Sequence, residues 1–373
     1  SMTNPTLTWE TTTQLDAGVD VGFLNQRIQL SADYFNKVTD DLLFNKTLPN
    51  TSGFGSILTN VGKVRFSGFD IELNTRNINT KNFSWDSRFI WSYVKNEVVK
   101  LPDNGRDRNR IGGYTVTMAD GSKREFGGTA EGEPLYRFYG YQTDYIIETM
   151  EQADNARYDE SSRGWRVSDG KYVLGRKDVG DYEWKDFNGD GRINGQDMFY
   201  MGTTMPHSTG GFGNTFAYKN FTLNIYMDWA LGHSICDQIF SRQFVNFFAN
   251  NSSLSAEVKK TWQKPGDKTK YARFSGNDSD DTNRNFRTVS NVFTTKADYL
   301  CLREISLQYN VPAEKLKKLG IYGLAVTLSG NNLHYFTKVK GISPETGTAS
   351  TYSSSYFSYP PIRRFSLGVK LTF

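Results

Sequence analysis

The feature that most constrains this chain is the strict alternation of its last residues. Leu367, Val369, Leu371 and Phe373 are apolar, whereas the residues between them are small or polar. Successive side chains of an extended strand point to opposite faces, so this segment has one apolar face and one polar face. Because it ends on an aromatic residue with no trailing tail, the pattern is typical of the last strand of a membrane barrel.

Composition supports strands over helices. No apolar run approaches the roughly 18 residues that a spanning helix needs, and the mean hydropathy is -0.57. Phe, Trp and Tyr make up 14% of the 373 residues, and 34 residues are Gly. This mixture favours long strands, tight turns and aromatic belts. The net charge of +4 and the lack of a basic stripe argue against nucleic acid as a partner.

The same period-2 alternation predicts long strands along most of the chain. The predicted strands are 10–23, 27–46, a segment ending near 77, 83–100, 211–218, 221–235, 298–310, 321–335 and the terminal segment. Connections are short after the first, third, fifth and seventh strands and long after the others, as in outer-membrane barrels. The fold class is therefore all-β, a transmembrane antiparallel β-barrel with long extracellular loops. Single-chain bacterial barrels have an even number of strands, so about nine strands represent the carboxy-terminal part of something larger.

This strand order predicts three regions. Residues 1–100 form barrel strands, 101–206 form an extracellular loop insertion, and 207–373 form the final barrel strands and loops. The insertion is far longer than a hairpin needs, so we expect a folded surface structure with its own strands, such as 135–147. No signal peptide opens the chain, which for an exported barrel indicates that the amino terminus here is not the natural one.

Several short segments, in a fixed order, carry a resemblance to a known family. They are Asn4 to Glu10, Asn60-Val61-Gly62, Phe138 to Tyr141, Asp186 to Asp197, Gly213 to Phe216, Leu302 to Leu307, Ser329 to Leu333 and the terminal strand. In these segments the chain resembles the SusC/RagA-like TonB-dependent outer-membrane transporters of Bacteroidetes. The resemblance implies a barrel of about 22 strands occluded by an amino-terminal plug. The plug and the TonB-contacting segment are not in this chain.

The resemblance also implies a function and partners. We expect TonB-dependent import of oligosaccharides, or in some members peptides, across the outer membrane, with this chain forming barrel wall and extracellular loops. The expected partners are a SusD-like surface lipoprotein, TonB through the absent plug region, the barrel-assembly machinery and outer-membrane lipid. The ending resembles the signal read by that machinery, with Ser366, Gly368, Leu371 and Phe373 as its residues.

One segment has the spacing of an EF-hand-type calcium loop. Its metal-ligand candidates are Asp186, Asn188, Asp190, Arg192 through its backbone carbonyl, and Asp197. Oxygen ligands at positions 1, 3, 5, 7 and 12 can surround a hard cation, and Gly191 permits the sharp turn. Asp197 replaces the usual Glu and flanking helices are not evident, so the sequence predicts a structural Ca²⁺ site, with a metal-free Asx-rich turn as the alternative.

The last long loop is aromatic. Tyr352, Tyr356, Phe357 and Tyr359 lie beside Ser and Thr residues, a composition that suits either sugar stacking or packing against other loops or a lid protein. On the strands, Trp85, Trp91, Tyr93 and Trp229 fit a lipid-facing girdle better than a ligand platform.

Nothing in the sequence indicates an enzyme. No Ser, Cys or His lies in a catalytic signature, and the strand carboxylates alternate as a solvated lumen wall would. Cys236 and Cys301 could be bonded or free. Two other functions stay open at this point: a barrel-anchored, calcium-dependent surface binding or adhesion protein, and a soluble calcium-dependent carbohydrate-binding sandwich.

Overall fold

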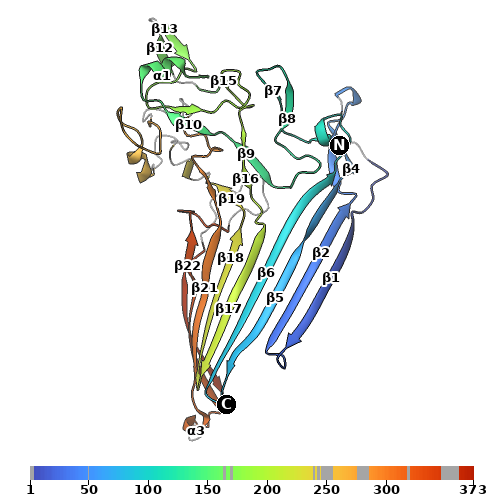
Figure 1. Cartoon of the computed structure of the whole chain (residues 1–373), viewed down its shortest axis with the longest axis vertical. Helices are drawn as coiled ribbons and strands as arrows, with labels where there is room; N and C mark the ends of the chain where they lie inside the picture. Colours follow the sequence, from blue (N-terminus) through green and yellow to red (C-terminus); the bar gives the residue numbers. More distant parts are fainter. Residues whose placement is uncertain are drawn as a thin grey trace.

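The computed structural model describes residues 4–48, 50–162, 165–168, 171–237, 240–241, 244, 255–274, 285–316, 320–345 and 361–373. The strands of one large sheet run along the long axis of the molecule, and all but one of the remaining described elements gather at one end (Figure 1). We call this the loop end and the opposite end the turn end. The carboxy terminus lies at the turn end (Figure 1).

The large sheet has nine antiparallel strands in the order β1-β2-β5-β6-β17-β18-β21-β22-β23. Their bounds are β1 Thr11–Phe23, β2 Ile28–Asp40, β5 Lys63–Asn79, β6 Phe83–Lys100, β17 Ser208–Tyr218, β18 Phe221–Leu231, β21 Tyr299–Asn310, β22 Gly323–Thr337 and β23 Arg364–Thr372. Each of the nine predicted strands is present in this sheet, and each pairs with its neighbour in sequence.

The register aligns residues of one kind across the strands. Ala32 of β2 lies opposite Ile71 of β5, which lies opposite Trp91 of β6. One residue along, Asp33 lies opposite Asp70. Side chains alternate between the two faces of a strand, so the sheet has a continuous apolar face and a continuous polar face.

The apolar face is open to its surroundings. In β23 the exposed fractions are 72% for Leu367, 60% for Val369 and 46% for Leu371. A soluble sandwich would seal these residues between two sheets, so that alternative is wrong. None of the helices in the described residues is long and apolar enough to cross a membrane.

Three predicted strands are each divided into two in the structure. The second strand ends at Asp40 because Asp41 has a positive φ of 58°, and the hairpin β3 Leu43–Thr47 and β4 Ser56–Asn60 follows it. The sixth ends at Leu231, and β19 Ser234–Cys236 pairs instead with β20 Thr294–Lys296. The segment 135–147 contains two short strands, β9 Arg137–Gly140 and β10 Thr143–Ile146.

The other elements at the loop end are short. They are η1 Asn50–Ser52, η2 Asp107–Asn109, β7 Tyr114–Thr117, β8 Lys123–Phe126, α1 Met150–Asn155, β11 Tyr158–Asp159, β12 Trp165–Ser168, β13 Lys171–Leu174, β14 Tyr182–Trp184, β15 Arg192–Ile193, β16 Phe199–Thr203 and η3 Ala256–Lys260. The small helix α3 Ala313–Leu316 lies at the turn end, in the predicted helical turn between β21 and β22.

These loop-end elements share a core of their own. Its buried members come from both long connections, the one between β6 and β17 and the one between β18 and β21, and include Phe138, Trp184, Phe244 and Phe293. Tyr141 of the first connection accepts a backbone hydrogen bond from Asn291 N of the second and donates one to Val289 O, both at 3.0 Å. We call the two connections together the loop-end body. Both cysteines are buried and free.

Candidate functional site

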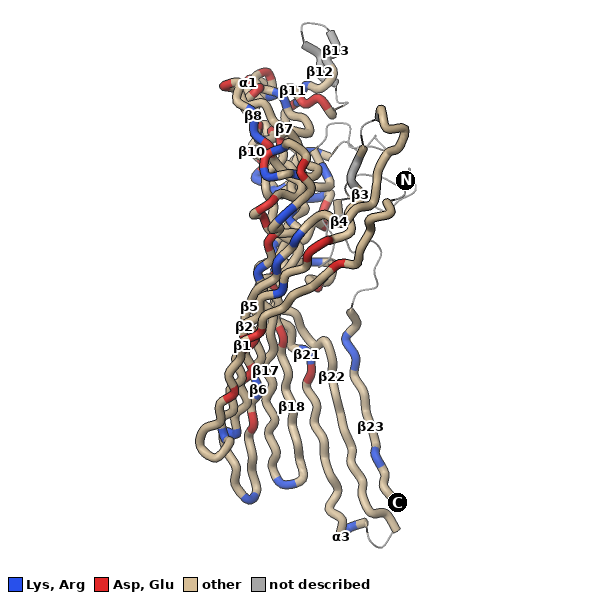
Figure 2. Tube along the Cα trace, turned by 90° about the vertical axis from the view of Figure 1, so that its right-hand side faces the viewer, with Lys and Arg blue, Asp and Glu red and all other residues tan. Residues whose placement is uncertain are grey.

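The polar face of the sheet holds the candidate site. Figure 2 shows charged residues concentrated in the loop-end body, with a smaller number along the strands. Two adjacent recesses on the polar face have opposite charge. We call them the turn-end recess and the mid-sheet recess.

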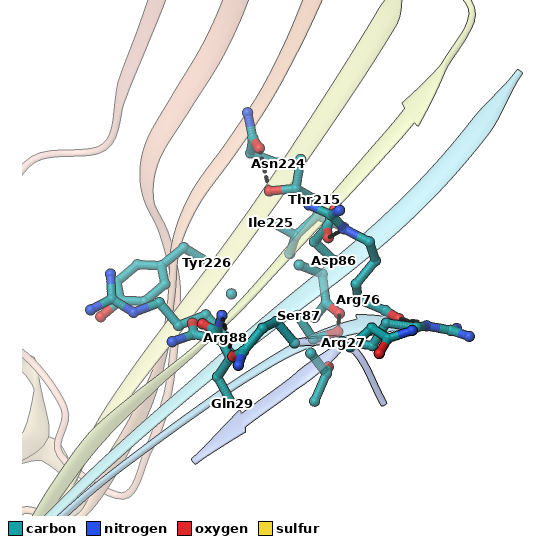
Figure 3. A pocket seen from close by; sticks show the side chains of 16 residues that line it. Arg27, Gln29, Arg76, Asp86, Ser87, Arg88, Thr215, Asn224, Ile225 and Tyr226 are labelled. Atoms are coloured by element: carbon teal, nitrogen blue, oxygen red, sulfur yellow. Dashed lines mark hydrogen bonds and ion pairs between the residues drawn. The ribbon is translucent and has the colours of Figure 1, made fainter. Parts of the chain in front are cut away.

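The turn-end recess has a volume of about 580 Å³ and is rich in hydrogen-bond donors (Figure 3). Its charged lining residues are Arg27, Arg76, Asp86 and Arg88. Arg76 Nε donates to Asp86 Oδ1 at 3.1 Å. All but Ile225 and Gly213 of the remaining lining residues carry amide or hydroxyl groups. An excess of guanidinium over carboxylate favours anionic groups in this recess.

The mid-sheet recess is acidic. It has a volume of about 510 Å³, and its charged lining residues are Asp33, Asp70, Glu72 and Asp228. Asp33 and Asp70 lie directly opposite each other on adjacent strands, an arrangement that is destabilising without water or counter-ions. Arg88 pairs with Glu72 at 3.2 Å and so links the two recesses. These carboxylates suit a water-filled interior wall.

A hydrogen-bonded network joins the sheet to the loop between β22 and β23. Arg303 lies at an irregularity of the register where β21 meets both β18 and β22. It donates to Asp228 Oδ1 at 2.6 Å, to Asn332 Oδ1 at 2.8 Å, and to Glu345 of the loop. Tyr335 donates to the same Glu345 carboxylate at 3.0 Å. The sequence did not predict this network. The bulge changes the direction of the Arg303 side chain, and the alternation of apolar and polar residues does not reveal such a bulge.

The calcium-type loop lies in the loop-end body and has the predicted turn geometry. Asp186 accepts hydrogen bonds from Gly189 N at 2.6 Å and from Gly191 N at 2.8 Å. Both glycines have positive φ, 77° and 78°, a conformation that costs them little. Asp190 accepts from Arg192 N at 2.8 Å.

The twelfth position closes the same loop. Asp197 is fully buried and accepts from Phe187 N and Asn194 N. Burial raises the pKa of this carboxyl to about 6, against those backbone hydrogen bonds, and the negative charges of Asp186 and Asp190 raise it further. Among the described residues, no group of three or more His, Cys, Asp and Glu side chains is arranged to hold a metal ion. The three carboxylates of the predicted set, Asp186, Asp190 and Asp197, are thus not gathered around one point, and the Ca²⁺ site stays a prediction.

A buried ion cluster ties the two parts of the loop-end body together. Asp159 is fully buried and contacts Lys177 Nζ at 3.1 Å and Arg287 Nη2 at 2.7 Å. The Arg287 guanidinium also lies over the Tyr141 ring, 4.0 Å from its centroid. Burial alone would raise the pKa of Asp159, but the two cations outweigh it and hold that pKa below its ordinary value. No sequence motif marks this cluster, because its members are far apart in the chain.

A second cluster lies where the loop-end body meets β6. Glu133 contacts Arg108 at 2.8 Å, Arg110 at 3.3 Å and Arg137 at 2.8 Å. Burial opposes the charge of Glu133, yet the three arginines lower its pKa. The adjacent backbone is bound to the strand, since Val98 N donates to Glu133 O at 2.9 Å.

The remaining predicted residues are placed as follows. Ser366, Gly368, Leu371 and Phe373 lie in or next to β23, where Leu371 is opposite Leu324 on the apolar face. Trp85, Trp91, Tyr93 and Trp229 lie in the sheet on that same face. Tyr352, Tyr356, Phe357 and Tyr359 lie outside the described residues.

One antiparallel sheet with an exposed apolar face and a charged polar face defines the wall of a membrane β-barrel. Residues 1–169 match the family described as TonB dependent receptor-like, beta-barrel. TonB-dependent receptor P3 of Formosa agariphila is 30% identical over 381 residues, covering 99% of this chain and 35% of that protein. TonB-dependent receptor SusC of Bacteroides thetaiotaomicron is 26% identical over 387 residues, covering 99% of this chain and 32% of that protein.

A solved structure shows the same fold. The RagAB peptide transporter matches with a TM-score of 0.73 and 20% identity, over 100% of this chain and 36% of that chain. The chain belongs to the TonB-dependent receptor family, as part of the barrel in the outer membrane. It spans about a third of the length of the curated relatives that it matches. The polar face is thus the lumen wall. The extracellular position of the loop-end body stays a prediction.

Proposed function

We propose that the full-length protein imports a nutrient across the outer membrane in a TonB-dependent manner. The observation that carries the proposal is the lumen wall, on which two recesses of opposite charge follow each other along the strands. Such a wall offers a solute successive weak polar contacts. The family relationship favours import over adhesion. TonB would act through the part of the protein outside this chain.

The proposed solutes are oligosaccharides or peptides. The turn-end recess offers amide, hydroxyl and guanidinium donors, which suit the hydroxyls, carbonyls and carboxylates of either class. A SusD-like surface lipoprotein would cover the extracellular side, and Tyr352, Tyr356, Phe357 and Tyr359 are proposed to contact that lid or the solute. The barrel-assembly machinery and the surrounding lipid complete the proposed partners.

Growth of a strain that lacks the gene tests the import proposal. The strain is grown on single glycans and single peptides, with and without the gene restored. We expect slower growth on a small group of related nutrients, reversed by the restored gene. A companion strain with Arg76→Gln and Arg88→Gln, compared with Lys219→Gln in the β17–β18 turn, reports whether the lumen arginines act in transport. Equal growth of the deletion strain on every nutrient would contradict import.

We also propose that the loop at 186–197 binds a structural Ca²⁺ through Asp186, Asn188, Asp190, the Arg192 carbonyl and Asp197. The support is the turn geometry and the mutual repulsion of Asp186, Asp190 and Asp197, which a divalent cation would relieve. The affinity should be modest, with a Kd on the order of 10⁻⁴ to 10⁻³ M, as in extracellular modules.

Calorimetry of the full-length protein with CaCl₂ tests the calcium proposal. We expect binding heat that Asp190→Asn reduces strongly and that Glu151→Gln, an exposed change on α1, leaves unaltered. Calcium should increase the protection of residues 187–197 from hydrogen exchange in the natural protein and in Glu151→Gln, but not in Asp190→Asn. The absence of any calcium-dependent heat would favour the metal-free turn.

We also propose that the barrel-assembly machinery recognises the carboxy terminus. Deletion of Phe373 should lower the amount of folded, heat-modifiable barrel, because the assembly signal ends on that aromatic residue. Phe54→Ala, which removes an exposed aromatic residue away from β23, is the matched control. An unchanged amount of folded barrel after the deletion rejects this role.

A further inference from the structure

A small recess on the lipid-facing side of the wall lies next to an aromatic row. Tyr34, Phe69 and Tyr93 stand directly opposite one another on β2, β5 and β6, and all three are exposed on the apolar face. Aromatic rows of this kind mark the level where the hydrocarbon region of a bilayer ends. The next outward-facing row towards the loop end is Asn36, Ser67 and Lys95.

The recess begins at this level and carries a net positive charge. Its volume is about 280 Å³, and its lining residues are Tyr34, Asn36, Arg65, Ser67, Lys95 and Glu97. Arg65 Nη1 lies 3.6 Å from Glu97 Oε2, so that pair is loosely neutralised. The side chain of Lys95 is exposed and forms no ion pair among the described residues. A positive recess at the headgroup level attracts anionic lipid.

Two polar atoms of the recess lack partners. Arg65 Nε and Asn36 Oδ1 are buried, and neither has a hydrogen-bond partner within the described part of the chain. Buried polar atoms in folded proteins nearly always have a partner, so water or a ligand from outside the chain is expected beside these two. One atom is a donor and the other an acceptor, and the ligand must therefore supply both an acceptor and a donor.

We propose that this recess binds the headgroup of an anionic, hydroxyl-bearing phospholipid. The phosphate oxygens accept from Arg65 Nε, Lys95 Nζ and the Ser67 hydroxyl, and a headgroup hydroxyl donates to Asn36 Oδ1. The acyl chains continue down the apolar face past Tyr34 and Phe69. The Tyr34 ring, 5.3 Å from that of Phe69, forms the boundary between headgroup and chain.

The test uses the full-length protein in nanodiscs of phosphatidylcholine containing a small fraction of phosphatidylglycerol. Native mass spectrometry counts the lipids that stay bound after release from the disc. We expect retained phosphatidylglycerol well above its share of the disc. Lys95→Gln should lower that retention about fivefold, as expected for one cation at a membrane surface. Asn36→Asp should lower it at least as much, because it places a carboxylate beside the phosphate.

Lys37→Gln is the matched control, because Lys37 follows Asn36 on β2 and faces the lumen. The proposal requires that this variant retain phosphatidylglycerol like the natural protein. It is overturned if Lys95→Gln and Lys37→Gln have the same effect, or if retention matches the composition of the disc. Inorganic phosphate is added in a further arm. If it binds with the same dependence on Lys95 while phosphatidylglycerol is not enriched, the site serves free phosphate and the lipid assignment is overturned.

Discussion

Val369 of β23 and Trp184 of β14 are both apolar, yet 60% of the first is exposed and the second is completely buried. The wall places its apolar side chains towards lipid and its charges towards the lumen. The loop-end body does the reverse, with a closed aromatic core and paired ions inside it. The two regions of the chain therefore remove apolar side chains from water in different ways. The wall exposes them to lipid, and the loop-end body packs them against one another.

This difference decides what a substitution does. In the wall the consequence depends on which face a residue occupies and on its depth in the membrane. In the loop-end body it depends on burial and on the partners that are lost, as in a water-soluble protein. The four predictions below test this division, from the largest expected effect to the smallest.

The largest effect is expected from Asp159→Asn in the loop-end body. The substitution removes a buried carboxylate that contacts two cations, and losing one partner of a buried ion pair costs about 3–5 kcal/mol. Hydrogen exchange of the loop-end body should rise strongly while the wall stays protected. Glu160→Gln is the control, since its pair with Arg192 is on the surface. Loss of protection in the wall as well would show that the two regions do not unfold separately.

The second prediction contrasts two adjacent residues of β5. Ile71→Arg places a charge on the lipid face and should destabilise the barrel by about 2–4 kcal/mol. Asp70→Arg faces the lumen and should have little effect on folding. Urea unfolding of the full-length protein in lipid vesicles measures both. Equal destabilisation by the two substitutions would contradict the assignment of Ile71 to the lipid face and of Asp70 to the lumen face.

The third prediction concerns acid. The pKa values of Asp159 and Glu133 are lowered in the folded state, since the attraction of their basic partners exceeds the cost of burial. The folded state therefore binds fewer protons than the unfolded state in mild acid. The stability that these groups contribute is fully present above about pH 4.5 and is lost as the pH falls through the lowered values.

Protease digestion between pH 7 and pH 3, followed for the loop-end body, measures this effect. Cleavage should rise at the acid end in the natural protein and should change less with pH in Asp159→Asn. If the amount of folded, heat-modifiable barrel stays constant between pH 7 and pH 3, the wall and the loop-end body respond to acid independently. Slower cleavage at low pH would mean that acid stabilises the loop-end body, and it would contradict this prediction.

The smallest effect is expected in the turn-end recess. Asp86→Asn removes the partner of Arg76, but both side chains are about half exposed, and such pairs contribute about 0–1 kcal/mol. Unfolding in urea should therefore hardly change, even if transport does. A loss of stability comparable with that of Ile71→Arg would indicate that the recess is not solvated.

The sequence by itself determined the wall. Alternation along β18 or β23 is a local property, repeated every two residues, so strand number, order and faces follow from it. The spacing from Asp186 to Asp197 likewise indicated the turn that the structure contains, because its hydrogen bonds join residues within twelve positions. Where the alternation was extended too far, as in the second strand beyond Asp40, a single backbone conformation at Asp41 ended it.

Only the tertiary structure decided how the rest is joined. Asp159 meets Arg287, Arg303 meets Glu345, and Arg65 comes beside Asn36 and Lys95 through pairings between residues distant in the chain. No local pattern encodes such meetings, since they depend on register, on bulges and on how two long connections pack together. The sequence specified which groups are charged or apolar, and the fold decided which of them share a neighbourhood and therefore which have partners.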